Sequence, residues 1–580
     1  MNKKFDRRGF VATAAKFGGA AAVFPLLLTE LAEAKAELSK TDVAAASAVA
    51  GLEFDDKQQE MMIEDLQDHL KAYKDIHDLK LPNSIPPALD FNPVLPGMNF
   101  ETARRPMKMS RAAEIAAPKN IEDVAFYSVR DLAELIRRKK ISSLDLTQMY
   151  LARLKRYDPQ LHFVVTLTEE RALAKAKEAD REIAAGKYRG PLHGIPWGAK
   201  DLLAVKGYPT TWGAGGFEKQ SFDEDAEVVK RLDAAGAVLV AKTTLGALAM
   251  GDKWFGGMTR NPWKIDQGSS GSSAGSASAT AAGCVGFAIG SETLGSISSP
   301  STRCGATGLR PTFGRVPRTG AMALSWSMDK LGPLCRYVED CALVFSAIYG
   351  PDNADRTVHD YAFNWDADLD IHKLRIGYLK EDFEHKPDPD DKETPEQTQR
   401  RLMAKKFDDA ALDVLRTKLK IDLIPLDLPK FPWGGMRPVL TAEAAAAFDE
   451  LTRSGRDKLL TEQSKDDWPN TFRAARFIPA VEYVNGNRAR MLGMQQVAEV
   501  FNKTDVIVAP TFSTQLLVTN LTGHPAVILP SGFRETDGTP VSLTFLGNLF
   551  GEAKMLAVAR AWEQATDYHT KHPKLEATKA

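Results

Sequence analysis

The chain has 580 residues, more than one ordinary small core would organise, and 44% of them are hydrophobic, as in globular proteins. Its 75 lysines and arginines balance 76 aspartates and glutamates, so no basic excess points to a nucleic-acid partner. The cysteines, Cys284, Cys304, Cys335 and Cys341, form no CxxC pair, which argues against a zinc site. We expect them to be buried as small hydrophobic residues, and a disulfide between them stays open.

The first 34 residues resemble a twin-arginine export signal. A basic start with the pair Arg7-Arg8 precedes a mildly apolar run at residues 11–28, and Ala32-Glu-Ala34 fits the small-x-small pattern of signal cleavage. The apolar run is shorter than the roughly 20 residues that span a bilayer, which disfavours a stable membrane anchor. We therefore expect export by the twin-arginine machinery and a periplasmic or secreted mature chain that begins near Lys35. A disordered tail is the alternative.

Residues 35–118 are predicted to form a helical, proline-rich N-terminal extension. Apolar side chains recur at helical spacing between residues 55 and 79, and three prolines follow, at positions 82, 86 and 87. The remainder up to residue 118 is proline-rich and irregular. We expect this extension to wrap on the main domain, and its function stays open.

Residues 119–575 are predicted to form the main domain. Ser128 and Ser142 have the pattern of helix N-caps, the second for a helix through residue 154. Expected strands lie at residues 163–167, 195–203, 237–241, 374–378, 506–510 and 526–529, and expected helices at 169–185, 225–235, 441–460 and 553–564, with a surface loop at 380–398. The alternation of strands and helices predicts an α/β domain with a large mixed, mostly parallel β-sheet flanked by helices.

Residues 268–309, GSSGSSAGSASATAAGCVGFAIGSETLGSISSPSTRCGATGL, are rich in glycine, serine and alanine without being a linker. Val285, Phe287 and Ile289 interrupt the stretch with the pattern of a short buried strand, which a flexible tether does not need. Small residues at this density allow backbone to approach backbone, and backbone N–H groups to approach a ligand. The stretch is therefore predicted to build a site.

This stretch resembles the signature of the amidase signature family, GGSSGGS followed by small residues and GTDxGGSIRxPAxxCG. Residues 190–201, GPLHGIPWGAKD, resemble the family's GPLHGIPxxxKD, and GLRPTFGR at 308–315, LGP at 331–333 and HPAVILP at 524–530 resemble later motifs in the same order. The resemblance covers roughly residues 127–573. It implies one large sheet flanked by helices, hydrolysis of an amide, and neither metal nor cofactor.

The resemblance also implies a Ser-Ser-Lys triad, a known variant of triad logic. Ser296 would be the nucleophile, Ser272, in a cis peptide, the proton relay, and Lys200 the base. The repeat GSSGSS offers Ser269 as a second choice for the middle serine, but the family's spacing favours Ser272 because Ser269 would require an insertion. Lys200 must be neutral to accept a proton, so burial has to lower its pKa from about 10.4.

The expected oxyanion hole consists of the backbone N–H groups of Thr293, Leu294, Gly295 and Ser296. Only two histidines, His193 and His524, fall inside the matched motifs, and no pattern ties either to a nucleophile.

Three positions in the signature stretch depart from the family pattern. Glu292 stands where the family has aspartate, Ser298 where it frequently has arginine, and Leu294 where it has glycine. Arg303 occupies a position that is usually apolar, and we expect it to replace the missing arginine as the partner of Glu292.

Three functions follow from these features. The first is an exported amidase that hydrolyses a small to medium amide through an acyl-enzyme. Its oligomeric state stays open, with a homodimer as one possibility. The second is the glutaminase (A-type) subunit of a tRNA-dependent amidotransferase. Such a subunit works in the cytoplasm with partner chains, so the export signal and the additional N-terminal segment argue against this function. The third is a catalytically inactive binding protein, against which intact Lys200, Ser272 and Ser296 argue.

Residues 352–490, the least motif-like region, are expected to form much of the acyl pocket. Residues 431–435, FPWGG, are a candidate lining, with aromatic core packing as the alternative.

Overall fold

The computed structural model describes residues 38–50, 52–79, 91–111, 114–384, 386 and 393–576. The predicted export signal at residues 1–34 and the three prolines predicted to end the first helix lie outside the described residues. No helix within these ranges is long and apolar enough to cross a bilayer. All four cysteines are buried and free, so no disulfide links them.

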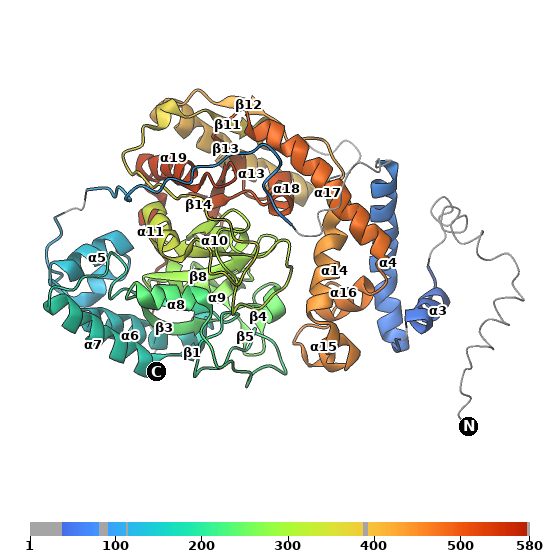
Figure 1. The fold of residues 1–580 in the computed structure, drawn as a ribbon, viewed down its shortest axis with the longest axis horizontal. Helices are drawn as coiled ribbons and strands as arrows, with labels where there is room; N and C mark the ends of the chain where they lie inside the picture. Colours follow the sequence, from blue (N-terminus) through green and yellow to red (C-terminus); the bar gives the residue numbers. More distant parts are fainter. Residues whose placement is uncertain are drawn as a thin grey trace, which may run out of the picture.

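Eleven of the described strands form one continuous mixed sheet, which confirms the expected fold class (Figure 1). From one edge to the other the order is β1 (Val164–Leu167), β3 (Val238–Thr243), β2 (Pro196–Lys200), β8 (Phe287–Glu292), β10 (Lys330–Cys335), β9 (Thr307–Arg310), β14 (Ala526–Phe533), β15 (Pro540–Gly547), β13 (Val506–Pro510), β11 (Ile376–Leu379) and β12 (Ile424–Leu426). Two small hairpins lie outside it, β4 (Lys253–Trp254) with β5 (Gly257–Met258) and β6 (Arg260–Asn261) with β7 (Lys264–Gly268).

The expectation that the sheet is mostly parallel is wrong. Among its ten neighbouring pairs of described strands, six run antiparallel, and the parallel pairs are β2–β3, β2–β8, β11–β12 and β11–β13. Strands alternate with helices in both halves of the domain, but helices between consecutive strands do not make those strands parallel neighbours: β8, α10 and β9 follow one another along the chain, yet β8 and β9 both pair antiparallel with β10. In the second half β14 and β15 are joined by the short turn at residues 534–539, and a turn of this length joins antiparallel strands.

Helices flank this sheet. Near the start of the domain these are α5 (Val129–Arg137), α6 (Ser143–Leu161), α7 (Glu169–Ala184) and α8 (Glu227–Ala234), and further along α11 (Val338–Ile348) and α19 (Glu552–Ala565). The predicted N-caps are confirmed, because the side chains of Ser128 and Ser142 accept hydrogen bonds from the backbone N–H groups of Asp131 and Asp145. Helix α6 continues past residue 154 and ends at His162, which adopts the left-handed conformation.

Two expectations in the second half are corrected. The predicted surface loop at 380–398 contains α12 (Lys380–Glu384) and the first turn of α13 (Pro395–Asp413), because Thr394 and Gln397 form a capping box with Pro395 at the first helical position. The single helix predicted at 441–460 is divided into α14 (Arg437–Ala447), α15 (Asp449–Arg453) and η6 (Arg456–Leu459); the left-handed Gly455 separates the last two.

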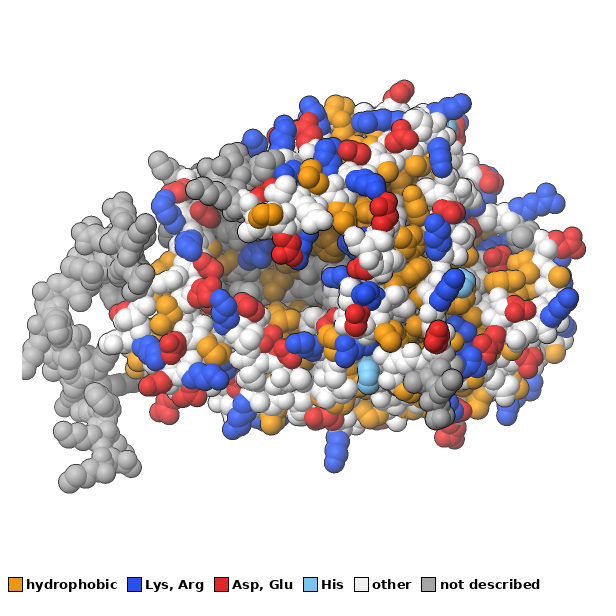
Figure 2. All heavy atoms as spheres, turned by 180° about the vertical axis from the view of Figure 1, so that it is seen from behind, with side chains coloured by type: hydrophobic (Ala, Val, Ile, Leu, Met, Phe, Trp, Pro, Cys, Tyr) orange, Lys and Arg blue, Asp and Glu red, His pale blue; other side chains and the backbone are white. Residues whose placement is uncertain are grey.

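The two described helices of the N-terminal extension pack on helices of the second half. Helix α4 (Asp56–Asp78) lies against α16 (Trp468–Ala475), η5 (Trp433–Met436) and α17 (Ala480–Phe501), and α3 (Lys40–Ala50) packs on α4 (Figure 1). Met62 and Val43 are buried against Ala474, and Asn470 Nδ2 donates to Asp65 Oδ2 at 2.6 Å. Figure 2 shows charges of both signs interspersed over one face, hollowed on the side where these helices lie.

Candidate active site

Lys200 is the last residue of β2 and is completely buried. Its Nζ lies 2.8 Å from Ser272 Oγ, 2.9 Å from Ser291 Oγ, 3.1 Å from Ser273 Oγ and 3.5 Å from the Ser291 carbonyl oxygen. Every one of these partners is neutral. Removal of the ammonium from water therefore lowers the pKa of Lys200 well below its ordinary value, although the negative charges of Asp329 and Glu292 oppose the shift.

Ser272 is also completely buried, and the Gly271–Ser272 peptide bond is cis. The second choice for the middle serine, Ser269, directs its hydroxyl to the Ser270 carbonyl oxygen at 2.8 Å, so the structure brings Ser272 to Lys200. The small residues of this stretch are a packing requirement. A Cβ atom on Gly271 would lie 1.8 Å from the Gly251 carbonyl oxygen, so only glycine fits.

Ser296 lies in the loop between β8 and α10 (Ser298–Cys304) and is partly exposed. Gly295, directly before it, adopts φ +90°, a conformation that favours glycine. The Ser273 N–H donates to the Ser296 carbonyl oxygen at 3.1 Å, which holds Ser296 beside the Ser272–Ser273 step, while no hydrogen bond joins the hydroxyls of Ser272 and Ser296 in the described residues. Catalytic hydrogen bonds are often long before substrate binds.

The loop that carries the expected oxyanion donors is braced at Thr293. The Thr293 hydroxyl donates to Asp329 Oδ1 at 2.6 Å, and Asp329 Oδ2 accepts the backbone N–H groups of Leu324 (2.7 Å) and Ser325 (2.9 Å). One carboxylate therefore ties the loop at 293–296 to the segment before β10.

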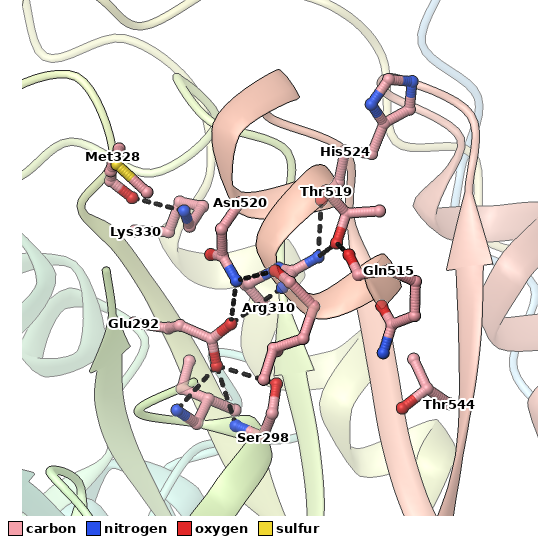
Figure 3. A network of polar contacts seen from close by, with 12 residues as sticks. Glu292, Ser298, Arg310, Met328, Lys330, Gln515, Thr519, Asn520, His524 and Thr544 are labelled. Carbon is pink, nitrogen blue, oxygen red and sulfur yellow. Dashed lines mark hydrogen bonds and ion pairs between the residues drawn. The ribbon is translucent and has the colours of Figure 1, made fainter. Parts of the chain in front are cut away.

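A buried carboxylate, Glu292, braces the other end of this loop (Figure 3). Its Oε2 accepts the N–H groups of Ile297 (2.9 Å) and Ser298 (2.8 Å) and the Ser298 hydroxyl (2.8 Å), and its Oε1 accepts Arg310 Nη1 and Asn520 Nδ2, both at 2.8 Å. Burial by itself would raise the pKa of Glu292, but the charge and hydrogen bond of Arg310 outweigh it and lower the pKa to about 2. The longer glutamate thus bonds to the serine that stands in place of the family's arginine.

The expectation that Arg303 pairs with Glu292 is wrong. Arg303, near the end of α10, is exposed, whereas Arg310 at the end of β9 is completely buried and makes the ion pair. The reason is strand order: β8 and β9 both pair with β10, which brings the end of β9 next to the end of β8. Arg310 also donates to Thr519 Oγ1 (2.7 Å) and to the His524 carbonyl oxygen (3.0 Å).

Both motif histidines have partners of their own. Burial, helped by the charge of Arg310, lowers the pKa of His524 to about 3, and its Nδ1 lies 2.8 Å from Thr522 Oγ1. His193 is buried; its Nδ1 accepts the Arg189 N–H at 3.1 Å and its Nε2 lies 3.3 Å from Glu182. Their contacts are structural, and neither ring is bonded to Lys200 or to the serines of the expected triad.

Several residues of the site were not predicted. Ser273 and Ser291 surround Lys200 and lie inside the signature stretch, where their proximity to Ser272 and Glu292 was an available signal. Arg310 lies in the motif at 308–315 and is the arginine that pairs with Glu292, the role that was expected of Arg303. No sequence pattern indicated that Asn520 and Asp329 belong to the site, because α18 (Thr514–Thr522) and the segment before β10 reach it only through the tertiary fold.

A cavity of about 210 Å³ adjoins the buried end of the site. Ser291 and Thr293 form part of its wall, and only Asp355 comes from the region 352–490. Its lining comprises Leu202, Ala249, Ser291, Thr293, Arg318, Thr319, Ala321, Met322, Ala323, Leu324, Trp326, Asp329, Leu331 and Asp355.

Trp433 belongs to the segment 431–435, which was a candidate lining of the acyl pocket. Its side chain is buried, packs against Gly493 and donates to the Pro429 carbonyl oxygen at 3.1 Å, as the alternative of core packing expected. Within the described ranges no group of three or more His, Cys, Asp or Glu side chains is arranged to hold a metal.

Comparison with known proteins places this site in a family. The family model described as Amidase matches residues 145–519. The chain is 34% identical over 484 residues to the A-type subunit of glutamyl-tRNA(Gln) amidotransferase from Acinetobacter baumannii, a match that covers 77% of this chain and 98% of the relative. A solved structure of the peptide amidase PAM with the competitive inhibitor chymostatin is 30% identical, with a TM-score of 0.67, and covers 78% of this chain and all (100%) of that one. The native peptide amidase from Stenotrophomonas maltophilia is also 30% identical (TM-score 0.64, covering 76% and 97%). The chain therefore belongs to the amidase signature family, whose enzymes hydrolyse carbon–nitrogen bonds of amides.

Proposed function

We propose that the chain is an exported amidase that hydrolyses its substrate through a Ser296–Ser272–Lys200 triad and an acyl-enzyme. The observation that carries the proposal is the buried contact of Lys200 Nζ with Ser272 Oγ at 2.8 Å, in surroundings that supply only neutral oxygens. Burial in such surroundings lowers the pKa of the lysine, so that it gives up its proton more readily than an exposed lysine and can act as a base.

In the acylation step Ser296 Oγ attacks the amide carbon and loses its proton to Ser272 Oγ, which passes its own proton to Lys200 Nζ. The negative charge forms on the former carbonyl oxygen, where the N–H groups of Thr293, Leu294, Gly295 and Ser296 stabilise it. Collapse of this intermediate breaks the carbon–nitrogen bond, and the proton returns through Ser272 to the leaving amine. An ester between the acyl group and Ser296 remains.

In the deacylation step water attacks the ester carbon and gives its proton to the same relay. The oxyanion donors stabilise the second tetrahedral intermediate, and Ser296 leaves with the proton that Ser272 returns. The braces at Glu292 and Asp329 keep the donor loop in one geometry through both steps, which supports a preorganised oxyanion hole.

The second candidate is the glutaminase subunit of a tRNA-dependent amidotransferase. The observation that favours it is the 34% identity to the A-type subunit of glutamyl-tRNA(Gln) amidotransferase over 98% of that protein. Such a protein would act with partner chains and take its amide from glutamine. Two features favour the exported amidase. One is the Arg7-Arg8 sequence, and the other is the N-terminal extension before residue 119, whose helix α4 makes buried contacts with α16.

Export is part of the proposal and rests on the sequence. Arg7-Arg8 and the Ala32-Glu-Ala34 pattern support transfer by the twin-arginine machinery into the periplasm or the medium. Expression of the full chain in a host with this pathway should yield a mature protein whose N-terminus lies near Lys35. Changing Arg7-Arg8 to two lysines should retain it in the cytoplasm; unchanged export would contradict this part.

The catalytic part is tested with purified protein and a panel of aryl amides, short peptide amides and glutamine. Ser296→Ala, Ser272→Ala and Lys200→Ala should each lower kcat by about three orders of magnitude or more. Ser299→Ala is the matched control, because Ser299 lies three residues from Ser296 and bonds to Ser270 instead, at 2.7 Å. Glutamine as the best substrate would favour the second candidate, and no turnover of any amide would favour an inactive binding protein.

A further inference from the structure

The cavity beside the site shares two wall residues with the surroundings of the proposed catalytic residues. Its wall includes Ser291, whose hydroxyl contacts Lys200, and Thr293, the first of the proposed oxyanion donors. A carbonyl oxygen held by the loop at 293–296 therefore has its acyl substituent at the entrance of this cavity.

Apolar side chains form most of the cavity wall. Leu202, Met322, Leu324 and Leu331 line it and are buried, and alanines fill much of the remaining wall. Trp326 also lines the cavity but keeps 51% of its surface exposed, which extends the apolar wall outward. A cavity of about 150 Å³ holds a benzene molecule, so the volume of about 210 Å³ accommodates one aromatic ring with a short chain.

Of the charged groups in the wall, Arg318 is already paired with Asp355, and Asp329 is already hydrogen-bonded by neutral donors. Arg318 places Nε 2.9 Å from Asp355 Oδ2 and Nη2 3.3 Å from Asp355 Oδ1, and its Nη1 donates to the Trp326 carbonyl oxygen at 2.8 Å. Asp329 accepts the Thr293 hydroxyl and the two backbone N–H groups of Leu324 and Ser325. A charged acyl group would lose its hydration here without gaining an unpaired partner, which is costly.

We infer that this cavity is the acyl pocket and that it selects an uncharged, apolar acyl group of the arylalkanoyl type, one ring on a short chain. This inference rests on the proposed function, because it assigns the substrate class of the same site. It also separates the two candidates, since the acyl group of glutamine carries an ammonium and a carboxylate. Met322, Ala323 and Trp326 are the residues that set the specificity.

The test uses one leaving group and varies the acyl group. The 4-nitroanilides of acetate, 3-phenylpropanoate, glutarate and γ-glutamate are compared by kcat/KM. The 3-phenylpropanoyl substrate should exceed the acetyl substrate by about tenfold or more, the range that one or a few apolar groups give in a hydrophobic pocket. The glutaryl and γ-glutamyl substrates should fall below the acetyl substrate.

Ala323→Leu fills the cavity from its wall and should lower kcat/KM for the 3-phenylpropanoyl substrate about tenfold, with the acetyl substrate within about threefold of wild type. Ala184→Leu, the same change at the exposed end of α7, is the matched control and should alter neither value. Equal losses on both substrates in Ala323→Leu, or preference for γ-glutamyl or glutaryl over 3-phenylpropanoyl, would overturn the inference while leaving the amidase itself standing.

A binding measurement separates this inference from the proposed function. Ser296→Ala should still bind 3-phenylpropanamide by calorimetry, because the cavity does not depend on the nucleophile, and adding Ala323→Leu should weaken that binding about tenfold. Binding without any turnover in wild type would contradict the catalytic proposal and leave the pocket intact. Absence of binding, or binding that Ala323→Leu leaves unchanged, would overturn the pocket assignment.

Discussion

The buried pair of Arg310 and Glu292 allows a quantitative test of how the donor loop is held. Both side chains are completely buried, and Arg310 Nη1 lies 2.8 Å from Glu292 Oε1. Arg310→Met keeps most of the side-chain volume but leaves Glu292 buried without its counter-charge. Removal of one partner of a buried ion pair costs about 3–5 kcal/mol, and here Thr519 Oγ1 and the His524 carbonyl oxygen also lose a donor. We expect a loss of unfolding free energy in this range.

The assay is urea unfolding followed by tryptophan fluorescence, with loss of amidase activity as a second probe. The control is Arg303→Met, because Arg303 is exposed and removal of an exposed charge changes stability by about 1 kcal/mol or less. The double variant Glu292→Gln/Arg310→Met should recover part of the loss, because no uncompensated charge remains.

The pH dependence of this loss has a defined direction. In wild type the folded-state pKa of Glu292 is lowered to about 2, so the contribution of this group to stability is present above its unfolded pKa and is lost as the pH falls toward 2. In Arg310→Met burial instead raises that pKa, and the penalty is relieved as the pH falls and the carboxyl takes up a proton. The difference in stability between wild type and variant should therefore shrink at low pH. A difference below about 1 kcal/mol at neutral pH, or an equal loss in Arg303→Met, would refute the reasoning.

Three further predictions concern the residues around the site. First, kcat/KM should fall as the pH is lowered through the depressed pKa of Lys200, because only the neutral amine accepts a proton, and a pH–rate profile without an acidic limb would contradict this role. Second, Thr293→Val removes the hydroxyl that bonds to Asp329. Steady-state kinetics should show kcat lowered about tenfold and KM changed by less than about twofold. An unchanged kcat would mean that this hydrogen bond is not needed to position the loop. Third, Asp201→Asn leaves Lys242, whose Nζ lies 2.7 Å from the Asp201 carboxylate, buried without its counter-charge. This variant should lose about 3–5 kcal/mol of unfolding free energy in urea, and Asp201→Asn/Lys242→Met should recover part of the loss. Equal stability of the single variant and wild type would contradict the pairing.

Local signals in the sequence were sufficient for much of the first half of the domain. Ser128 and Ser142 cap helices as their neighbours predict, and the small residues around Ser272 occur where backbone packs on backbone. The family resemblance then identified Lys200 and Ser272, which the fold brings within 2.8 Å of each other although 72 positions separate them. Neither residue type alone would have indicated this contact.

Errors arose where long-range pairing decides the structure. Arg303 was expected to be the partner of Glu292 because it occupies a usually apolar position of the family pattern, whereas the sheet brings Arg310 on β9 to β8 through β10. The antiparallel centre of the sheet has the same origin, since period-two strand patterns carry no information on direction. Asn520 reaches Glu292 from 228 positions away, a distance over which no local pattern acts.

Locating the covalent intermediate tests the proposed Ser296–Ser272–Lys200 triad most directly. The purified protein is treated with a fluorophosphonate probe, digested, and analysed by tandem mass spectrometry, alongside Lys200→Ala and Ser299→Ala. We expect an adduct on Ser296 in wild type and in Ser299→Ala, formed much more slowly in Lys200→Ala. An adduct on another serine, or labelling that does not depend on Lys200, would contradict the proposed triad.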